Sequence, residues 1–175
     1  MENMSAVDVA PAGEGDQAEL AALAAATFPL ACPPSAAPED ISAFIAANLS
    51  EQRFAEYLAD PGRVVLRAAD TGRIVGYAML IRGVGDDPDI SGSVPQRPAV
   101  ELSKMYVVPD YHRTGAAAAL IRSGIGWAAG SGARAVWLGV NQNNERAQRF
   151  YRKHRFAVTG TRRFRLGTVL EDDFV

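Results

Sequence analysis

The fold of this chain is decided by the stretch MYVVPDYHRTGAAA, which runs from Met105 to Ala118. Its first four residues are apolar and predict a strand, and its last residues begin a segment typical of a helix that extends to Ala129. The N–H groups at the start of a helix have no partner within the helix, and the helix dipole makes that end positive. Because Gly115 and the alanines after it are small, an anion fits closely against these N–H groups. The stretch therefore predicts a strand, a tight turn and a helix start that together bind a phosphate group.

The composition is that of a single globular domain covering residues 1–175. The chain is 48% hydrophobic and 22% charged, and it is long enough to bury a core. No apolar run is long enough to cross a bilayer, and the N-terminus lacks the basic start of a signal peptide. The single cysteine, Cys32, excludes an intramolecular disulfide and favours a cytoplasmic location. One cysteine and two histidines, His112 and His154, argue against a zinc site, so no metal is expected.

The net charge of −2 is unevenly distributed along the chain. Residues 1–100 hold 6 basic and 14 acidic side chains, giving −8, and residues 101–175 hold 12 basic and 6 acidic, giving +6. Because the basic half contains the predicted phosphate site, its cations either form an ordinary solvated helix face or attract a polyphosphate ligand. The near-neutral total and the low aromatic content argue against nucleic acid as a partner.

The order of the expected elements predicts a mixed α/β (α+β) domain. It has a central, mostly antiparallel sheet of about six or seven strands, flanked by about four or five helices. Residues 83–98 are expected to form a long loop, and Asp16 with Glu19 fits a capping box. Strands are expected over residues 6–10, 63–69, 74–82, 99–108, 135–140, 157–164 and 170–175. Helices are expected over residues 16–28, 38–49, 50–58, 115–129 and 144–154, the third capped by Ser50 and the fourth stopped by Gly130.

A second informative segment is the helix expected over residues 144–154, with Asn144 as its cap. Ala147, Phe150, Tyr151 and His154 fall on one face of this helix. A core-facing stripe accounts for Phe150. The hydroxyl of Tyr151 requires a hydrogen-bond partner or water if it is buried, and a phenol beside a cleft is suited to act as a general acid.

Together the two segments resemble the signatures of the GCN5-related N-acetyltransferase (GNAT) family. The acetyl-CoA motif of that family, Gln/Arg-x-x-Gly-x-Gly/Ala, corresponds to residues 112–117. Its second motif, Asn-x-x-Ala-x-x-Phe-Tyr-x-Lys-x-Gly-Phe, corresponds to residues 144–156. The resemblance implies the GNAT fold, with the central strands splayed apart. It also implies an acetyl-CoA-dependent N-acetyltransferase, in which a primary amine attacks the thioester directly.

The resemblance also implies roles for particular residues. The strand before the turn would bind the pantetheine arm, and the amides of the turn would hold the pyrophosphate. Asn144 would contact the pantetheine or cap its helix, and Tyr151 would protonate the CoA thiolate. No cysteine nucleophile is required, so Cys32 is interpreted as structural. The residues expected to bind acetyl-CoA are Met105, Tyr106, Val107, Arg113, Thr114, Gly115, Ala116, Ala117, Ala118 and Asn144.

Glu101 is the candidate for the base that deprotonates the acceptor. Its alternative is an exposed carboxylate near the start of the strand, and a water chain would serve equally as the base. By the two-residue period of a strand, Glu101 shares a face with Met105 and Val107 unless a bulge intervenes. Lys104 and Tyr106 then lie on the opposite face, where Lys104 is expected to be solvated or paired.

The chain departs from the family motifs at several positions. Thr114 stands where many members have a second basic residue or Gly, and Ala116-Ala117 replaces a bulkier residue followed by Gly. His112 replaces the usual Gln or Arg, and Arg155 replaces the Gly before Phe156. If that second position requires a positive φ, Arg155 carries a strain of about 1 kcal/mol or more. Pyrophosphate contacts come chiefly from backbone N–H groups, so the change at His112 removes no essential part.

The acceptor is expected to be a small amine, and the stretch from Glu101 to Val107 is similar to that of bacterial polyamine acetyltransferases. The alternatives are a protein or peptide amine, or a non-catalytic CoA-binding regulatory domain. The acids of the long loop, Asp86, Asp87 and Asp89, either favour a cationic acceptor or merely keep the loop soluble. The sequence leaves a homodimer open.

Overall fold

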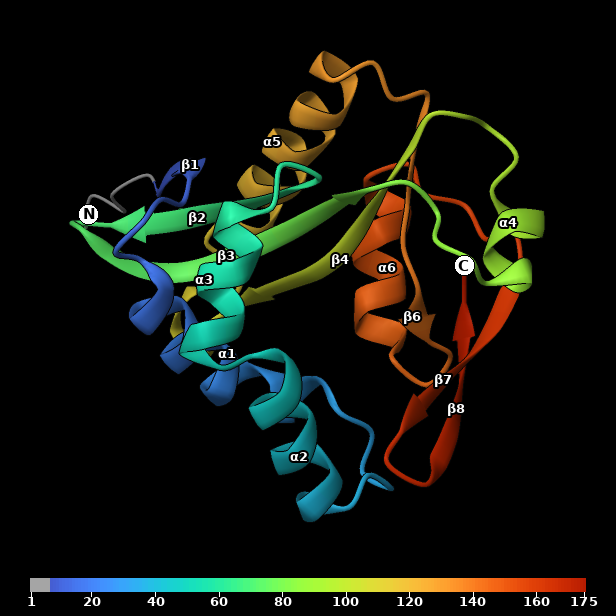
Figure 1. Ribbon diagram of the computed structural model, residues 1–175, viewed down its shortest axis with the longest axis horizontal. Coiled ribbons are helices and arrows are strands. Elements are labelled where there is room, and N and C mark those ends of the chain that lie inside the picture. Colours follow the sequence, from blue (N-terminus) through green and yellow to red (C-terminus); the bar gives the residue numbers. More distant parts are fainter. Residues whose placement is uncertain (1–6) are drawn as a thin grey trace.

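A computed structural model of the protein describes residues 7–175 and shows a mixed α+β architecture, which confirms the predicted fold class (Figure 1). Ala6, the first residue of the first predicted strand, lies outside the described residues. The helices are α1 (Gln17–Ala31), α2 (Pro38–Asn48), α3 (Glu51–Ala59), α4 (Pro88–Ser93), α5 (Ala116–Gly130) and α6 (Glu145–Lys153). The strands are β1 (Asp8–Pro11), β2 (Arg63–Asp70), β3 (Arg73–Arg82), β4 (Ala99–Val107), β5 (Ala135–Trp137), β6 (Val140–Asn141), β7 (Thr161–Leu166) and β8 (Val169–Phe174). None of the helices within residues 7–175 is long and apolar enough to cross a membrane.

Helices cover both faces of a five-stranded sheet whose order is β1-β2-β3-β4-β5. Neighbouring strands are antiparallel except β4 and β5, which run parallel because α5 crosses over between them. On one face, α1 and α3 bury Leu20 and Phe54 against the sheet. On the other face, Leu120 of α5 packs against Val75 and Leu80. Figure 1 shows α1 and α3 on one side of the sheet and α5 on the other.

The sheet opens between β4 and β5. These strands pair only between Ala99–Glu101 and Ala135–Trp137. The chain then leaves the first sheet, and β6 pairs with β8 in a second sheet of order β6-β8-β7. The single strand predicted over residues 135–140 is therefore two short strands in different sheets. Past Glu101 the edge of β4 is open, and Figure 1 shows β4 diverging from the second sheet.

A bulge interrupts β4 in the middle. Met79 of β3 pairs with Lys104, but the next residue, Leu80, pairs with Leu102. Ser103 is therefore an extra residue with no partner opposite it. An extra residue of this kind reverses the alternation of side chains along the rest of the strand.

Because of the bulge, the side chains of β4 lie on different faces from those predicted. Glu101 lies on the same side as Lys104 and Tyr106, facing α1 and α2, whereas Met105 and Val107 pack on the side of α5. Glu101 therefore does not share a face with Met105 and Val107, because the bulge that was the stated exception to this expectation is present. A single unpaired residue is sufficient to move all the later side chains of a strand from one face of the sheet to the other.

The first helix begins without the predicted capping box. The Asp16 carboxylate accepts a hydrogen bond from the Gly13 N–H at 2.9 Å, outside the helix. Glu19 accepts from the N–H of Ile74 at 2.7 Å and so ties α1 to β3. The box fails because both carboxylates bind backbone donors from other segments. At the end of α5, the left-handed turn lies at Gly132 rather than at Gly130.

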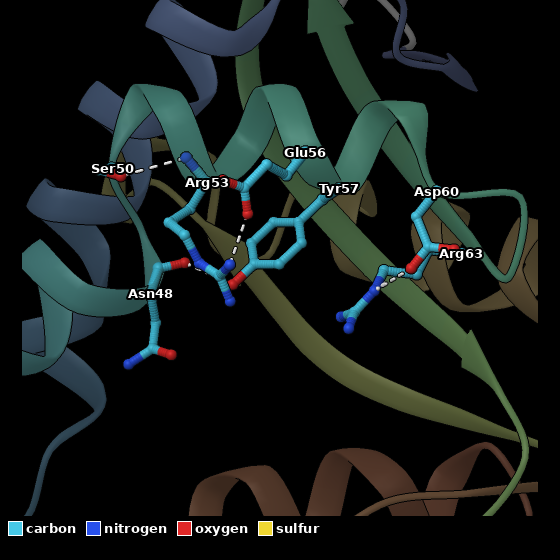
Figure 2. Close-up of polar contacts among 7 residues, drawn as sticks. All are labelled: Asn48, Ser50, Arg53, Glu56, Tyr57, Asp60 and Arg63. Carbon is cyan, nitrogen blue, oxygen red and sulfur yellow. Dashed lines mark hydrogen bonds and ion pairs between the residues drawn. The ribbon is translucent and has the colours of Figure 1, made fainter.

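Helix α3 begins with the predicted cap, since Ser50 Oγ accepts from the Arg53 N–H at 3.1 Å. At its other end Asp60 holds the Arg63 Nε at 2.8 Å (Figure 2). The ring of Tyr57 lies 5.1 Å from the Arg53 guanidinium and 4.9 Å from that of Arg63. Arg63 is thus a fixed cation at the start of β2, and Ile81 links it in register to Glu101 of β4.

The segment predicted as a long loop contains a short helix, α4. Asp87 caps it by accepting from the Asp89 N–H at 2.9 Å. The sequence does not predict this helix because it contains Gly92 and two serines, which are weak helix formers. Packing of Ile90 and Val94 against Trp137 stabilises it instead.

Candidate active site

A cavity of about 520 Å³ lies where β4 and β6 separate. It brings together the open edge of β4, the first turns of α5 and α6, the end of α1 and the hairpin of β7 and β8. Of the predicted site residues, the cavity is lined by Glu101, Met105, Tyr106, Val107, Ala117, Asn144 and Tyr151. The remaining ones, Arg113, Thr114, Gly115, Ala116 and Ala118, belong to the turn and helix start beside Ala117.

The turn before α5 has the geometry of an anion site. Arg113 and Gly115 adopt left-handed φ angles of 66° and 88°, and no side chain caps the helix. Thr114 differs from the other predicted donors, because its N–H and its hydroxyl both donate to the Tyr111 carbonyl, at 3.4 and 2.6 Å. In this turn and helix start, the N–H groups that have no acceptor among the described residues are those of Arg113, Gly115, Ala116, Ala117 and Ala118. Free donors gathered at a helix start attract phosphate oxygens.

The backbone of β4 presents hydrogen-bonding groups to the cavity. The Val108 N–H donates to the Val75 carbonyl at 2.9 Å, so the backbone groups of Val108 and of Tyr106 face β3. Those of Met105 and Val107 therefore face the open edge, where the Met105 groups and the Val107 N–H can pair with an extended ligand as a strand does, while the Val107 carbonyl accepts from His112. Tyr106 contributes its side chain to the cavity, because its backbone is used by the sheet.

His112 connects the turn to α6. Its Nε2–H donates to the Val107 carbonyl at 2.9 Å, and its Nδ1 accepts from Arg146 Nη2 at 2.9 Å. These partners fix the tautomer that carries its proton on Nε2. The imidazole thereby holds the Arg146 guanidinium at the same end of the cavity as the free donors of α5. A cation thus lies near the position where the family motif has Gln or Arg.

Helix α6 is fixed at both ends. Asn144 Oδ1 accepts from the Ala147 N–H at 3.1 Å, so the predicted capping role of Asn144 is confirmed. At the other end the Phe156 N–H donates to the Tyr151 carbonyl and the Arg155 N–H donates to that of Arg152, both at 3.0 Å. This pattern is a Schellman motif, and the accompanying apolar contact places the rings of Phe156 and Tyr151 5.7 Å apart. Tyr151 is therefore held by its backbone and by its ring.

The left-handed residue of this motif is Arg155, with a φ of 68°. The expected strain at the family's glycine position is thus present. Replacing Arg155 with glycine is expected to raise the free energy of unfolding by about 1 kcal/mol, because glycine adopts this conformation without steric strain. Urea denaturation measures the difference. The matched control is Arg152→Gly, inside the helix, which is expected to lower stability by about 1 kcal/mol. A loss of stability in Arg155→Gly would contradict the interpretation.

Tyr151 has the protonation state that a general acid requires. Burial raises the pKa of Tyr151 to about 12, so the phenol keeps its proton at neutral pH. Among residues 7–175 its hydroxyl has no hydrogen-bond acceptor, and the side chain borders the cavity. Burial also raises the pKa of the neighbouring Tyr106, with smaller contributions from Tyr151 and Cys32. Tyr151 is therefore placed to give a proton to a group bound in the cavity.

Glu101 lies in the cavity wall, and it is not the exposed carboxylate of the alternative interpretation. Burial raises the pKa of Glu101, and the opposing effects of Arg162, Lys104 and Arg63 are smaller. A carboxylate with a raised pKa binds a proton more strongly than an ordinary glutamate. This is the property that a general base near neutral pH requires.

The sequence model of the acetyltransferase (GNAT) family matches residues 23–156. The chain belongs to this family. It is 60% identical over 160 residues to an uncharacterised N-acetyltransferase of Mycobacterium tuberculosis strain H37Rv, covering 91% of this chain and 95% of that protein. A relative from Mycobacterium bovis has the same identity and coverage. The GNAT resemblance is confirmed, and the chain is an N-acetyltransferase.

Solved structures show the same fold. The PaiA N-acetyltransferase of Thermoplasma acidophilum, in complex with coenzyme A, superposes with a TM-score of 0.72 at 14% identity, covering 97% of this chain and 98% of that one. An aminoglycoside antibiotic 6′-N-acetyltransferase of Acinetobacter haemolyticus gives a TM-score of 0.69 at 18% identity, covering 93% and 99%. At these identities the likeness is one of fold.

Sequence patterns do not predict the charges that the C-terminal hairpin brings to the cavity. Asp173 is buried, accepts from Arg162 Nε at 3.2 Å and has a pKa raised by burial. Glu171 accepts from Asn141 Nδ2 at 3.3 Å. The one local signal is Gly139, between β5 and β6, where a Cβ atom would overlap the Arg162 guanidinium.

Cys32 borders the cavity, although the sequence places it far from the motifs. Its Sγ donates to the Phe28 carbonyl at 3.3 Å, and burial raises the pKa of the thiol, so it is not activated as a nucleophile. The loop acids Asp86, Asp87 and Asp89 do not line the cavity. They therefore do not form the cationic acceptor site that was one interpretation of them.

Proposed function

We propose that this N-acetyltransferase transfers the acetyl group of acetyl-CoA directly to the nitrogen of a small primary amine. The observation that carries the proposal is the shared cavity, in which Tyr151 and Glu101 lie with the open edge of β4 and the free donors of α5 close by. These are the parts that the reaction needs: a holder for each substrate, a base for the amine and an acid for the thiol.

The residues at the α5 end are suited to acetyl-CoA. The free N–H groups of Arg113 and of Gly115 to Ala118 would hold the pyrophosphate, with Arg146 adding positive charge. The open backbone groups of Met105 and the N–H of Val107 would pair with the amides of the pantetheine arm. Alanine side chains at the helix start leave room for the phosphates. When bound, acetyl-CoA supplies the thioester carbonyl that the amine attacks.

Two residues then move the protons. Glu101 takes one proton from the acceptor ammonium, which frees the nitrogen lone pair. The new C–N bond forms as the C–S bond breaks, and Tyr151 donates its proton to the sulfur. Tyr151 recovers a proton as the nitrogen loses its second one. Acetylated amine and CoA thiol result, with one proton released from Glu101 to solvent.

A small cationic acceptor is supported by the carboxylates around the cavity. Glu101, Glu171 and Asp173 all line it. The Ser35 hydroxyl donates to Glu171 at 3.4 Å and so connects the α1–α2 segment to β8 beside the cavity. A cavity of about 520 Å³ is in the range of small-molecule sites. Because Asp173 is paired with Arg162, Glu101 and Glu171 are the carboxylates left to attract an ammonium group of the acceptor.

The proposal is tested by incubating the protein with acetyl-CoA and a panel of amines and measuring thiol release. The panel contains diamines, polyamines, aminoglycosides, amino acids and lysine-containing peptides. Turnover with the small polycations and not with the peptides is expected. Turnover with peptides alone would contradict the small acceptor. Tight CoA binding without thiol release from any amine would favour a regulatory domain.

A substitution at the start of α5 tests the pyrophosphate site. Ala117→Asp is expected to weaken acetyl-CoA binding by at least about tenfold, or about 1.4 kcal/mol, because its carboxylate competes with the phosphates for the free donors. Isothermal titration calorimetry measures the change. The control is Ala129→Asp, the same change at an exposed position near the other end of α5. Equal affinities in both variants would place the pyrophosphate elsewhere.

A further inference from the structure

Lys104 is a primary amine inside the proposed acetyl-transfer cavity. The chain contains only two lysines, Lys104 and Lys153. Lys153 is exposed at the end of α6, whereas Lys104 lines the cavity together with Glu101, Tyr106 and Tyr151. The bulge at Ser103 is what turns Lys104 to this side of the sheet.

The Lys104 ammonium group has no ion-pair partner among the described residues. Its Nζ lies 5.7 Å from the ring centre of Phe44 in α2, and within residues 7–175 it forms no salt bridge. The charged groups that face it are Glu101 on β4, Arg63 on β2 and Arg162 on β7. Burial lowers the pKa of Lys104, Glu101 opposes the shift, and Arg63 and Arg162 add to it. More of this amine is therefore neutral, and nucleophilic, than for an ordinary lysine.

We propose that Lys104 is a self-acetylation site: in the absence of a free amine, the enzyme transfers the acetyl group of acetyl-CoA to Lys104 Nζ of the same chain. This inference rests on the proposed function, since it uses the same thioester and the same acid. The cavity that would hold an acceptor is lined by Phe44 and Tyr151, and the Lys104 side chain lies in the same cavity.

The transfer balances without another reactant. The neutral Nζ attacks the thioester carbonyl carbon, a C–N bond forms and the C–S bond breaks. Tyr151 donates its proton to the sulfur and recovers one from Nζ, so the products are Nε-acetyl-lysine and CoA thiol. Glu101 lies near enough to influence Lys104 electrostatically, and it takes the proton from the fraction of Nζ that starts as ammonium.

Acetylation would change the cavity in two ways. It removes the positive charge beside Glu101, and it fills part of the space that an acceptor needs. An enzyme that runs out of acceptor would therefore slow itself, and a bound acceptor would protect Lys104 by occupying the same space. The reagent that modifies Lys104 is therefore an acyl thioester bound in the cavity beside β4.

The experiment uses the unmodified protein and peptide-level mass spectrometry after timed incubation with acetyl-CoA alone. Acetylation of Lys104 is expected to be at least about tenfold faster than that of the exposed Lys153, because only Lys104 is held beside the thioester. Lys153 serves as the internal control for non-enzymatic acetylation. The first-order rate is expected to be unchanged when the protein is diluted, as for a reaction within one chain, and to fall in Tyr151→Phe.

Thiol release with the amine panel is measured on the same samples, so that two failures are distinguished. Turnover of an amine with Lys104 unmodified would overturn self-acetylation and leave the proposed function standing. Acetylation of Lys153 as fast as Lys104, or a rate that rises with protein concentration, would also overturn it. Absence of both thiol release and acetylation would overturn the proposed function itself. Lys104→Arg, which keeps the charge, is expected to abolish the modification.

Discussion

Replacing Tyr151 with phenylalanine is expected to lower kcat for acetyl transfer by roughly 10²–10⁴-fold, the usual contribution of a positioned general acid. The thiolate then leaves without a proton donor. The affinity for acetyl-CoA is expected to stay within about twofold, since the ring and its contact with Phe156 remain. Steady-state kinetics and calorimetric binding to CoA separate the two effects.

A matched control for this substitution is Tyr57→Phe. It removes a phenol hydroxyl that donates to the Asn48 carbonyl at 2.8 Å, outside the cavity (Figure 2). Its kcat is expected to equal that of the unmodified protein. If Tyr151→Phe keeps full turnover as well, the proton reaches the sulfur by another route and Tyr151 is not the acid.

Glu101→Gln is expected to give the second large effect, a fall of about 10²-fold in kcat/KM near neutral pH. The glutamine keeps the shape of the side chain but accepts no proton. The exposed Glu56 of α3 offers the same change away from the cavity, so Glu56→Gln serves as the control. An unchanged kcat/KM in Glu101→Gln would assign the base to water.

The dependence of kcat/KM on pH also tests Glu101 as the general base. Activity requires the ionised form of Glu101, so kcat/KM is expected to rise with pH through a pKa above that of an ordinary glutamate, because burial raises it. In Glu101→Gln this rise disappears. Tyr151 must stay protonated, so the falling limb due to Tyr151 lies near pH 12, the raised pKa of its phenol. A rise at the pKa of free glutamate would contradict the buried environment of Glu101.

The parts of the site that depend on local sequence were predictable. The small residues after Gly115 predict the free helix start, and Asn144 predicts the cap of α6, because each pattern lies within one turn of the chain. The positive φ of Arg155 follows in the same way from its place beside Phe156. Turn and capping signals of this kind do not depend on distant contacts.

The parts that depend on pairing between distant segments were not predictable. Nothing near Ser103 marks the bulge, which exists only relative to Met79 and Leu80 of the neighbouring strand. Glu19 looks like a capping residue until Ile74, 55 residues away, supplies a better donor. The charges at Arg162 and Asp173 enter the cavity only because the C-terminal hairpin pairs with β6.

The bulge also determines which changes of length β4 tolerates. Ser103 is the residue of β4 that has no partner on β3, so its deletion would leave Leu102 opposite Leu80 and Lys104 opposite Met79, and the side chains after it would keep their faces. An insertion between Lys104 and Val107 would instead move every later side chain of the strand to the other face. A change in the length of β4 is therefore expected to be tolerated at the bulge and not after it. Sequence comparisons among the relatives of this chain should show any gap within β4 at Ser103 and none between Lys104 and Val107.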